Sequence, residues 1–523
     1  MDDGPVVLAG VAAMASELPT PAAVPHEKQS YREILKTSAM IGGSAAINVC
    51  IGMVRTKVMA VLLGPAGYGL MGAYVLLADL ARNVAQMGLN ASGVRQIADA
   101  VASDDPARIA RTVIVLRWTS LACAVLGTAL MVALAGPIST LTFGSDRHAV
   151  SVALLSLAVF FSLVAGGQGA LLQGMRRIGD MSRLAVLGGL LGVVIGVPLV
   201  YFLGEDGVVP TLVIVAASSL AISWWYSRKI RVGAPDLSLA EVVNESSALL
   251  KLGVAFMASA LLMTGAAYVV RIIVLRKAGL DAAGVYYAAW TLGGLYIGFV
   301  LQALGADFYP RLVGVAQDNA ECNRLVNEQA QVSLLLALPG VLITLTLAPL
   351  VISLFYSAKF APAVDVLRWI CLGMAVRVLT WPIGYIVVAK NRQVLFFITE
   401  LAWAIVNVGL TWWCVEIFGV NGAGIAFFGC CVFHGLLVYP VVRRLSGFRW
   451  TAVNLKTAVC CFAMIFAVFM CFHVLPPLAA ISFGVVATIA STYASIRILV
   501  HLASPQRLPR SIGRFLQLGR LIQ

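Results

Sequence analysis

The chain has 523 residues, of which 60% are hydrophobic and only 12% are charged, and its formal net charge is +13. A soluble domain carries roughly 25% charged residues, so this composition excludes a soluble globular protein and indicates a polytopic membrane protein. The basic residues are scattered singly at the ends of apolar segments, which is typical of topology signals and argues against nucleic acid as a partner.

The first part of the chain holds an apolar run from Pro5 to Met14 that is too short to span a bilayer. Its start carries Asp2 and Asp3 instead of the Lys or Arg that a signal peptide requires. We therefore expect a flexible cytoplasmic tail over residues 1–30, with a cleavable signal as the alternative.

Fourteen later segments have the roughly 20 apolar residues that a transmembrane helix needs. These predicted spans are residues 34–63, 68–90, 107–135, 149–173, 180–203, 207–227, 248–275, 284–308, 328–355, 363–389, 393–418, 421–441, 451–473 and 477–501.

Lys and Arg gather in every second connection, before span 1 and after each even-numbered span. The connections between them, such as GPAGYG and FGVNGA, are poor in cations, with Arg147, Arg276, Lys277 and Lys359 as exceptions. Cytoplasmic loops are the ones enriched in Lys and Arg, so both termini are predicted to be cytoplasmic. One missed or false span would invert the later part of this pattern.

Three loop patterns recur at a nearly constant separation. The segment from Gly64 to Gly69 resembles that from Gly279 to Gly284, and GEDG at Gly204 resembles GVNG at Gly419 at the same distance along the chain. At almost the same distance, Pro137, Phe143 and Ser145 recur as Pro349, Phe355 and Ser357. Gly and Pro mark turns in any protein, so a single match would mean little, but three in register indicate an internal repeat.

Six spans per repeat give both halves the same orientation, as expected for a pseudo-two-fold axis along the membrane normal. The predicted fold is an all-α membrane protein with two six-helix bundles and two extra C-terminal spans. Its parts are a flexible tail (1–30), an N-terminal bundle (31–228), a cytoplasmic linker (229–247), a C-terminal bundle (248–445), spans 13 and 14 (446–502) and a basic cytoplasmic tail (503–523).

Charged residues inside the predicted spans are the candidate functional residues, because each costs about 2.5–3.5 kcal/mol at the centre of a bilayer. Arg55 and Lys57 lie about 200° apart on one helix, so we expect Arg55 to face a central cleft and Lys57 to lie at its edge, with snorkelling of both as the alternative. Arg82 shares a helix face with Asp79, so an ion pair and a substrate contact are both open.

Further cations lie in later spans. Arg271 is the deepest cation of span 7, and we expect it to line the same cleft. Arg117 lies part-way into span 3 and either receives an anionic substrate or snorkels.

The second half adds two candidate pairs for coupling or gating. Arg377 and Glu400 lie in spans 10 and 11, where they form either a structural pair or a coupling-ion or proton site. Asp307 and Arg311 lie one turn apart at the end of span 8, as an inner gate or a helix-end pair.

Motifs for other chemistry are missing from the sequence. It holds no P-loop and no HExxH, and neither its cysteines nor its five histidines have the spacing of metal ligands. We expect no cofactor, no metal and no enzymatic activity.

The segments RTKVMAVLLGPAGYGLMGAY and SGVRQIA, and then RIIVLRKAGLDAAGVYYAAWTLGGLYIGFVLQALGADFYPRL and LFYSAKFAPA, resemble the Wzx-type polysaccharide flippases. These belong to the multidrug/oligosaccharidyl-lipid/polysaccharide exporter superfamily. The likeness extends from about Leu35 to Leu445, whereas spans 13 and 14 depart from the twelve spans usual in that family and match the number in lipid II flippases.

The resemblance implies a flippase for an undecaprenyl-diphosphate-linked oligosaccharide, an O-antigen or exopolysaccharide repeat unit, in a bacterial inner membrane. It also implies the bilayer, a polysaccharide polymerase and a chain-length regulator as partners, and H+ or Na+ as counter-ion. Arginine suits a diphosphate through its planar fork of donors, so Arg55, Lys57, Arg82, Arg117 and Arg271 become the expected substrate contacts.

Three other functions compete with this one. A multidrug or cation exporter of the same superfamily would need unpaired carboxylates in its N-terminal bundle, and a lipid II flippase would share the span number. A glycan polymerase or ligase would need a large loop with catalytic residues, which the sequence lacks. A scaffold of polysaccharide assembly would need no cations inside its spans.

Overall fold

The computed structural model describes residues 27–230, 233 and 238–502. Within these residues the chain is helical, and eleven helical segments are long and apolar enough to cross a membrane. The protein is therefore an all-α membrane protein, as the composition predicts. The predicted tail segments over residues 1–26 and 503–523 lie outside the described residues.

The internal contacts divide the chain into two units. Unit 1 comprises Met1–Gly284 and Phe355–Ser357, and unit 2 comprises Val285–Leu354 and Ala358–Gln523. Unit 1 contains the helices α2 (Glu27–Gln86), α3 (Leu89–Ala102), α4 (Pro106–Ala133), α5 (Ala135–Phe143), η1 (Asp146–His148), α6 (Ala149–Gly174), α7 (Ile178–Val194), α8 (Gly196–Leu203), η2 (Gly204–Gly207), α9 (Val208–Ser227) and α10 (Leu239–Ala278). The remaining helices are α11 (Leu280–Gly314), which begins in unit 1, α12 (Asn319–Thr346), α13 (Ala348–Phe355), η3 (Ala358–Phe360), α14 (Ala363–Ala389), α15 (Gln393–Phe418), α16 (Asn421–Ser446), α17 (Ala452–Val474) and α18 (Pro477–Leu502).

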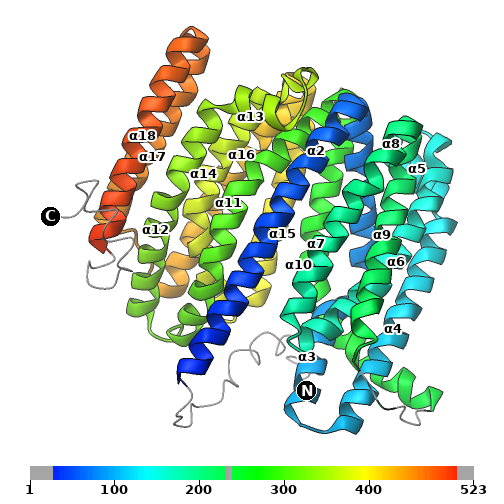
Figure 1. Ribbon diagram of the computed structural model, residues 1–523. Coiled ribbons are helices and arrows are strands. Elements are labelled where there is room, and N and C mark those ends of the chain that lie inside the picture. The colour runs from blue at the N-terminus through cyan, green and yellow to red at the C-terminus, as the bar shows by residue number, and fades with distance from the viewer. Residues whose placement is uncertain (1–26, 231–232, 234–237, 503–523) are drawn as a thin grey trace, which may run out of the picture. The chain divides into compact units, whose positions relative to one another are not determined.

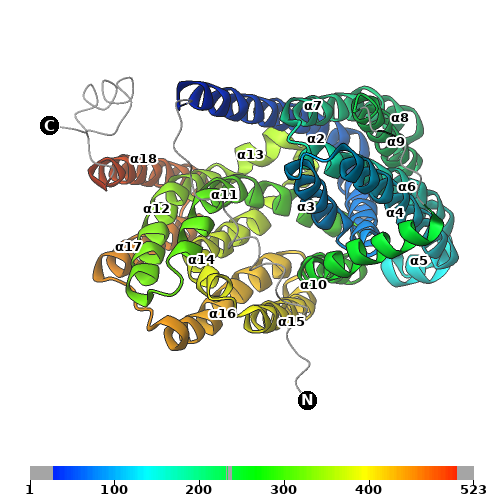
Figure 2. The same cartoon turned by 90° about the horizontal axis from the view of Figure 1, so that it is seen from below.

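In unit 1, α6 packs against α4 and α9, and α7 packs against α2 and α9 (Figure 2). α10 packs against α2, α3 and α4. The capping box of Ser238 and Glu241 starts α10 inside the segment that the sequence predicts to be a linker, because it satisfies amide groups that a helix start leaves unpaired.

Two predicted spans join into one kinked helix in α2. At Gly64 the backbone has φ 64° and ψ −174°, and Pro65 follows without an amide donor. A side chain at Gly64 would be strained in this conformation, so glycine is what permits the sharp break between the two arms of α2.

The backbone repeats its conformations at the separation found in the sequence. Gly279 has φ 91° and ψ 175°, close to Gly64, and Gly419 has φ 58° and ψ −140° where Gly204 has φ 60° and ψ −133°. Asp105 and Asp318 both cap the helix that follows them, α4 and α12.

A further match involves residues that the sequence patterns do not single out. Arg176 and Asn391, which are as far apart in the chain as the paired glycines, have φ 54° and 55°. The next residues donate to carbonyls at equivalent positions, Arg177 to Leu172 at 2.9 Å and Arg392 to Val387 at 3.0 Å. The repeat therefore extends to positions such as Arg176 and Asn391, where the residue type differs.

The last two helices are integral to unit 2. α18 packs against α12 and α17, and α17 packs against α12 and α14 (Figures 1 and 2). Gly484 of α18 lies so close to Thr346 of α12 that an added Cβ would stand 2.4 Å from the threonine hydroxyl. At the C-terminal end of α17, the Arg368 guanidinium lies 3.8 Å from the centre of the Phe472 ring.

Buried asparagines hold the start of α17. The side chain of Asn327 in α12 donates from Nδ2 to the Arg449 carbonyl at 3.1 Å. Its Oδ1 accepts a hydrogen bond from the backbone amide of Thr451 at 3.0 Å. Asn454 of α17 donates to the Asn327 carbonyl at 2.7 Å, and Asn327 and Asn454 are only 7% and 4% exposed. These bonds satisfy polar groups that have little access to water, so they fix the turn between α16 and α17.

Replacing Asn327 by Leu should lower the melting temperature of the detergent-solubilised protein. The substitution removes the acceptor of the Thr451 amide and the donor to the Arg449 carbonyl, and each polar group left unpaired away from water costs about 1–3 kcal/mol. Asn244→Leu on the exposed face of α10 is the matched control and should melt like the wild type. Equal melting temperatures for both variants would contradict the proposed anchor.

Candidate functional site

A charged cluster lies between α2 and α10 in unit 1. Arg82 Nη2 lies 2.9 Å from Asp79 Oδ1, one turn away on α2, and each side chain is 41% exposed. Arg271 of α10 lies near enough for its charge to act on Asp79, and its Nη1 donates to the Gly72 carbonyl at 3.1 Å. Two guanidinium groups share one carboxylate, so the cluster has a net charge of +1.

The same two helices have further polar contacts beside this cluster. The Asn83 side chain of α2 donates to the Thr264 hydroxyl of α10 at 3.0 Å. Gly88, which follows α2 and precedes α3, touches Gly253 of α10, because a Cβ on Gly88 would lie 1.9 Å from the Gly253 carbonyl oxygen. We use the name charged seam for the part of the α2–α10 contact that holds Asp79, Arg82 and Arg271.

The C-terminal end of α10 is tied to α5. The hydroxyls of Tyr268 and Thr142 lie 2.5 Å apart. Arg276 donates to the carbonyls of Thr140 and Leu141 at 3.0 and 2.8 Å, at the end of α5, where unpaired carbonyls attract a cation.

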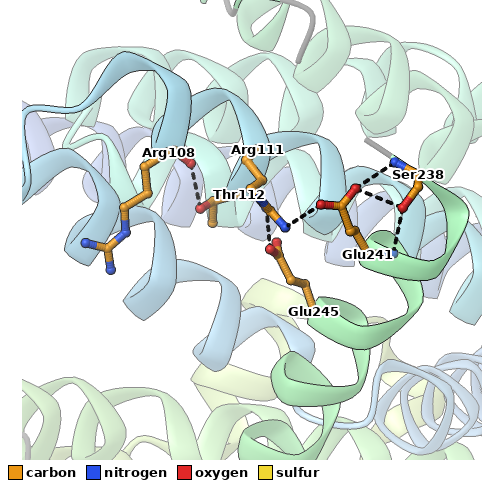
Figure 3. A network of polar contacts seen from close by, with 6 residues as sticks. All are labelled: Arg108, Arg111, Thr112, Ser238, Glu241 and Glu245. Carbon is orange, nitrogen blue, oxygen red and sulfur yellow. Dashed lines mark hydrogen bonds and ion pairs between the residues drawn. The ribbon is translucent and has the colours of Figure 1, made fainter. Parts of the chain in front are cut away.

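The N-terminal end of α10 is tied to α4 (Figure 3). Arg111 of α4 points between Glu241 and Glu245 of α10, with its Nη2 3.4 Å from Glu241 and its Nε bonded to Glu245. Ser238 donates to the same Glu241 carboxylate through its amide at 2.9 Å and its hydroxyl at 2.8 Å. These donors, followed by the charge of Arg111, hold the pKa of Glu241 below its usual value, so the carboxylate keeps its charge at neutral pH.

The other cations expected to contact substrate lie outside the charged seam. Arg55 is exposed beside Gly192 of α7, whose Cβ would stand 3.6 Å from the guanidinium. Lys57 donates to the Tyr356 carbonyl. Arg117 of α4 is half-buried, and its Nε has no hydrogen-bond partner among the residues that the structure describes.

Unit 2 holds a second group of charged residues. Glu400 of α15 has Oε1 3.6 Å from Nε2 of His434 on α16. Arg377 of α14 and Glu400 both act electrostatically on the Cys430 thiol of α16. Asp307 and Arg311 lie elsewhere, as an exposed pair along α11 with 3.1 Å between Oδ2 and Nη1.

His434, Arg111 and Glu245 were not singled out as site residues from the sequence, whereas Glu400 was. His434 and Glu400 come from different helices, as do Arg111 and Glu245, so no periodic pattern connects the members of either pair. For His434 the available signal is its place inside an apolar span, since ionisable groups there usually face protein or a cavity. No group of three or more His, Cys, Asp or Glu residues in the described part of the chain could hold a metal ion.

Comparison with known proteins shows which family the chain matches. The family described as "Polysaccharide biosynthesis protein" matches residues 58–365, more than half of the chain. The lipid III flippase of Escherichia coli (strain K12) is 22% identical over 412 residues, covering 75% of this chain and 94% of that protein. The lipid III flippase of Shigella flexneri gives the same values.

Two solved structures show the fold. An inward-facing multidrug resistance MATE family transporter of the MOP superfamily matches with a TM-score of 0.65 at 16% identity, covering 76% of this chain and 94% of that one. The lipid II flippase MurJ in its inward closed conformation matches with a TM-score of 0.62 at 14% identity, covering 88% and 99%. The family match and the two folds agree with the resemblance that the sequence motifs indicate.

Replacing Arg111 by Ala should lower the melting temperature in detergent at low salt. The Arg111 side chain is 40% exposed, so solvent screens its pairs, the expected loss of stability is small, and high salt should reduce it further. The loss should also shrink as pH falls through the lowered pKa of Glu241, because the protonated carboxyl no longer pairs.

Arg108→Ala is the matched control, one turn earlier on α4. The Arg108 guanidinium makes no ion pair with the other residues drawn in Figure 3. Equal losses from both variants, unaffected by salt, would exclude a specific bond between α4 and α10.

Proposed function

Because the chain belongs to the polysaccharide biosynthesis protein family, we propose that it is a flippase for an undecaprenyl-diphosphate-linked oligosaccharide. The substrate would be an O-antigen or exopolysaccharide repeat unit, moved from the cytoplasmic to the periplasmic leaflet. The observation that carries this proposal is the likeness to the lipid III flippase along 94% of that protein.

The proposed path follows from the architecture. Fourteen crossings of a bacterial inner membrane leave both termini in the cytoplasm, and the two halves of the repeat alternate in exposing a central cavity. The two arms of α2 provide two of the crossings, and the pairs α7–α8 and α12–α13 provide one each. Spans 13 and 14 move as part of the C-terminal bundle because α17 and α18 pack on α12.

The charged seam supplies the contact for the diphosphate. Its net charge of +1 attracts an anion, and the planar guanidinium of Arg82 or Arg271 binds phosphate oxygens in a bidentate manner. Asp79 holds Arg82 while no substrate is present. An incoming phosphate would take the place of this carboxylate, so the two arginines are never left unpaired in the membrane. Arg55, Lys57 and Arg117 would contact the substrate at other points of its path.

The alternatives within the superfamily differ in the charge that they require. A multidrug or cation exporter needs an available carboxylate, but Asp79 is shared by two arginines. A lipid II flippase would share the diphosphate contact and differ in the glycan. A scaffold of polysaccharide assembly would transport nothing.

Partners follow from the same proposal. A polysaccharide polymerase and a chain-length regulator would act on the flipped repeat units, and H+ or Na+ would serve as counter-ion. We propose transport without a cofactor and without a catalysed reaction.

Replacing Arg271 by Ala should abolish surface polysaccharide while the protein stays in the membrane, because the seam loses its net positive charge. Arg55→Ala should have the same effect if Arg55 lies on the path. Arg497→Ala, on an exposed face of α18, is the control and should leave export intact. The measurement is the amount of surface polysaccharide relative to membrane-bound protein.

A normal polysaccharide level in Arg271→Ala would exclude the charged seam from the path. To distinguish the alternatives, purified protein in proteoliposomes should be offered polyprenyl-diphosphate oligosaccharide, lipid II and a cationic drug. Movement of the drug alone would overturn the flippase proposal.

A further inference from the structure

The candidate path does not use the pair formed by Glu400 and His434 in unit 2. Glu400 Oε1 lies 3.6 Å from His434 Nε2, just beyond the length of a hydrogen bond. The two side chains are only 18% and 20% exposed, and they lie within α15 and α16, both apolar enough to span a membrane. An isolated carboxylate at such a place is costly, so its protonation state depends on its neighbours.

The charged and titratable neighbours of this pair come from two helices packed against α15. α14 contributes Arg377, and α16 contributes Cys430 beside His434. Cys430 donates its thiol to the Trp403 carbonyl at 3.4 Å, so it is already engaged. With Arg377 charged, Glu400 ionised and His434 neutral, the formal charges sum to zero.

One buried nitrogen of the pair, Nε2 of His434, has no hydrogen-bond partner among the described residues. A proton added to the carboxylate or to the ring would lie between the two groups, and a small approach would turn their 3.6 Å separation into a hydrogen bond. The step adds one proton, which forms one O–H or N–H bond, and it breaks no covalent bond of the protein.

The chemistry of the pair favours a proton over a metal cation. Sodium, like other hard cations, prefers several oxygen ligands, whereas this group offers one carboxylate, an imidazole and a thiol.

We propose that Glu400 and His434 together bind one proton, and that this proton is the counter-ion that drives substrate movement. Proton binding by the pair rests on the geometry of unit 2 alone, whereas the role of this proton as counter-ion rests on the proposed flippase function. Release of the proton to one side of the membrane and uptake from the other would couple the pair to the conformational cycle.

Proton binding is tested without any substrate. In detergent-solubilised full-length protein, the pH difference infrared spectrum should contain a carboxylic acid band that Glu400→Gln removes and His434→Gln shifts to another pH. Glu416→Gln, at the exposed end of α15, and His473→Gln, at the end of α17, are matched controls and should leave the band unchanged. A band that persists in Glu400→Gln would overturn the proposal.

Coupling is tested in proteoliposomes that hold polyprenyl-diphosphate oligosaccharide. If one proton moves per substrate, each pH unit across the membrane should shift the distribution of substrate between leaflets by up to about tenfold. Glu400→Gln should remove this shift while still allowing exchange without a gradient, and Glu416→Gln should retain it.

The two proposals fail in different ways. Substrate movement that ignores the pH gradient in the wild type would overturn proton coupling and leave the flippase intact. No movement of the lipid under any condition would overturn the flippase function, and the infrared band would still decide whether the pair binds a proton.

Discussion

Two arginines and one carboxylate lie between α2 and α10, where a charge in the membrane has to be compensated by nearby groups. Asp79 compensates Arg82 along its own helix, and Arg271 reaches across to the Gly72 carbonyl. Any movement of α10 away from α2 would leave Arg271 without this acceptor. α10 also contacts α4 through Arg111 at one end and α5 through Tyr268 at the other. These contacts help to hold α10 beside α2. The charge balance of the seam therefore depends on the position of α10.

The internal repeat gives the two halves the same points of bending. Gly64 and Gly279 both have positive φ with extended ψ, and Gly204 matches Gly419 in both angles. A conformation closed to most side chains is fixed by residue type, which is why loop glycines preserve the repeat when the helices between them have diverged. The matching ends at Arg176 and Asn391 show that geometry can persist where residue type does not.

The sequence predicts apolar helices and local pairs well, because both follow from short-range rules. Hydrophobic length defines the helices, and the i, i+3 spacing brings Asp79 to Arg82. The contacts of Glu400 depend instead on how α14, α15 and α16 pack, which no local pattern encodes. Arg377 is expected opposite Glu400 from depth alone, whereas the structure places His434 nearest to its carboxylate. The hydrophobic pattern also misses the start of α10, since the capping box of Ser238 extends the helix into a polar segment.

The two charged groups differ in what they can accept. The seam of unit 1 carries a surplus positive charge on guanidinium groups that do not lose their protons, so it can attract an anion. The group in unit 2 is formally neutral and contains an imidazole and a carboxylate, so it can take up one proton without a large charge imbalance. Glu400 and His434 lie in unit 2, whereas Arg82 and Arg271 lie in unit 1, so the group that can take up a proton is separate from the group that attracts an anion.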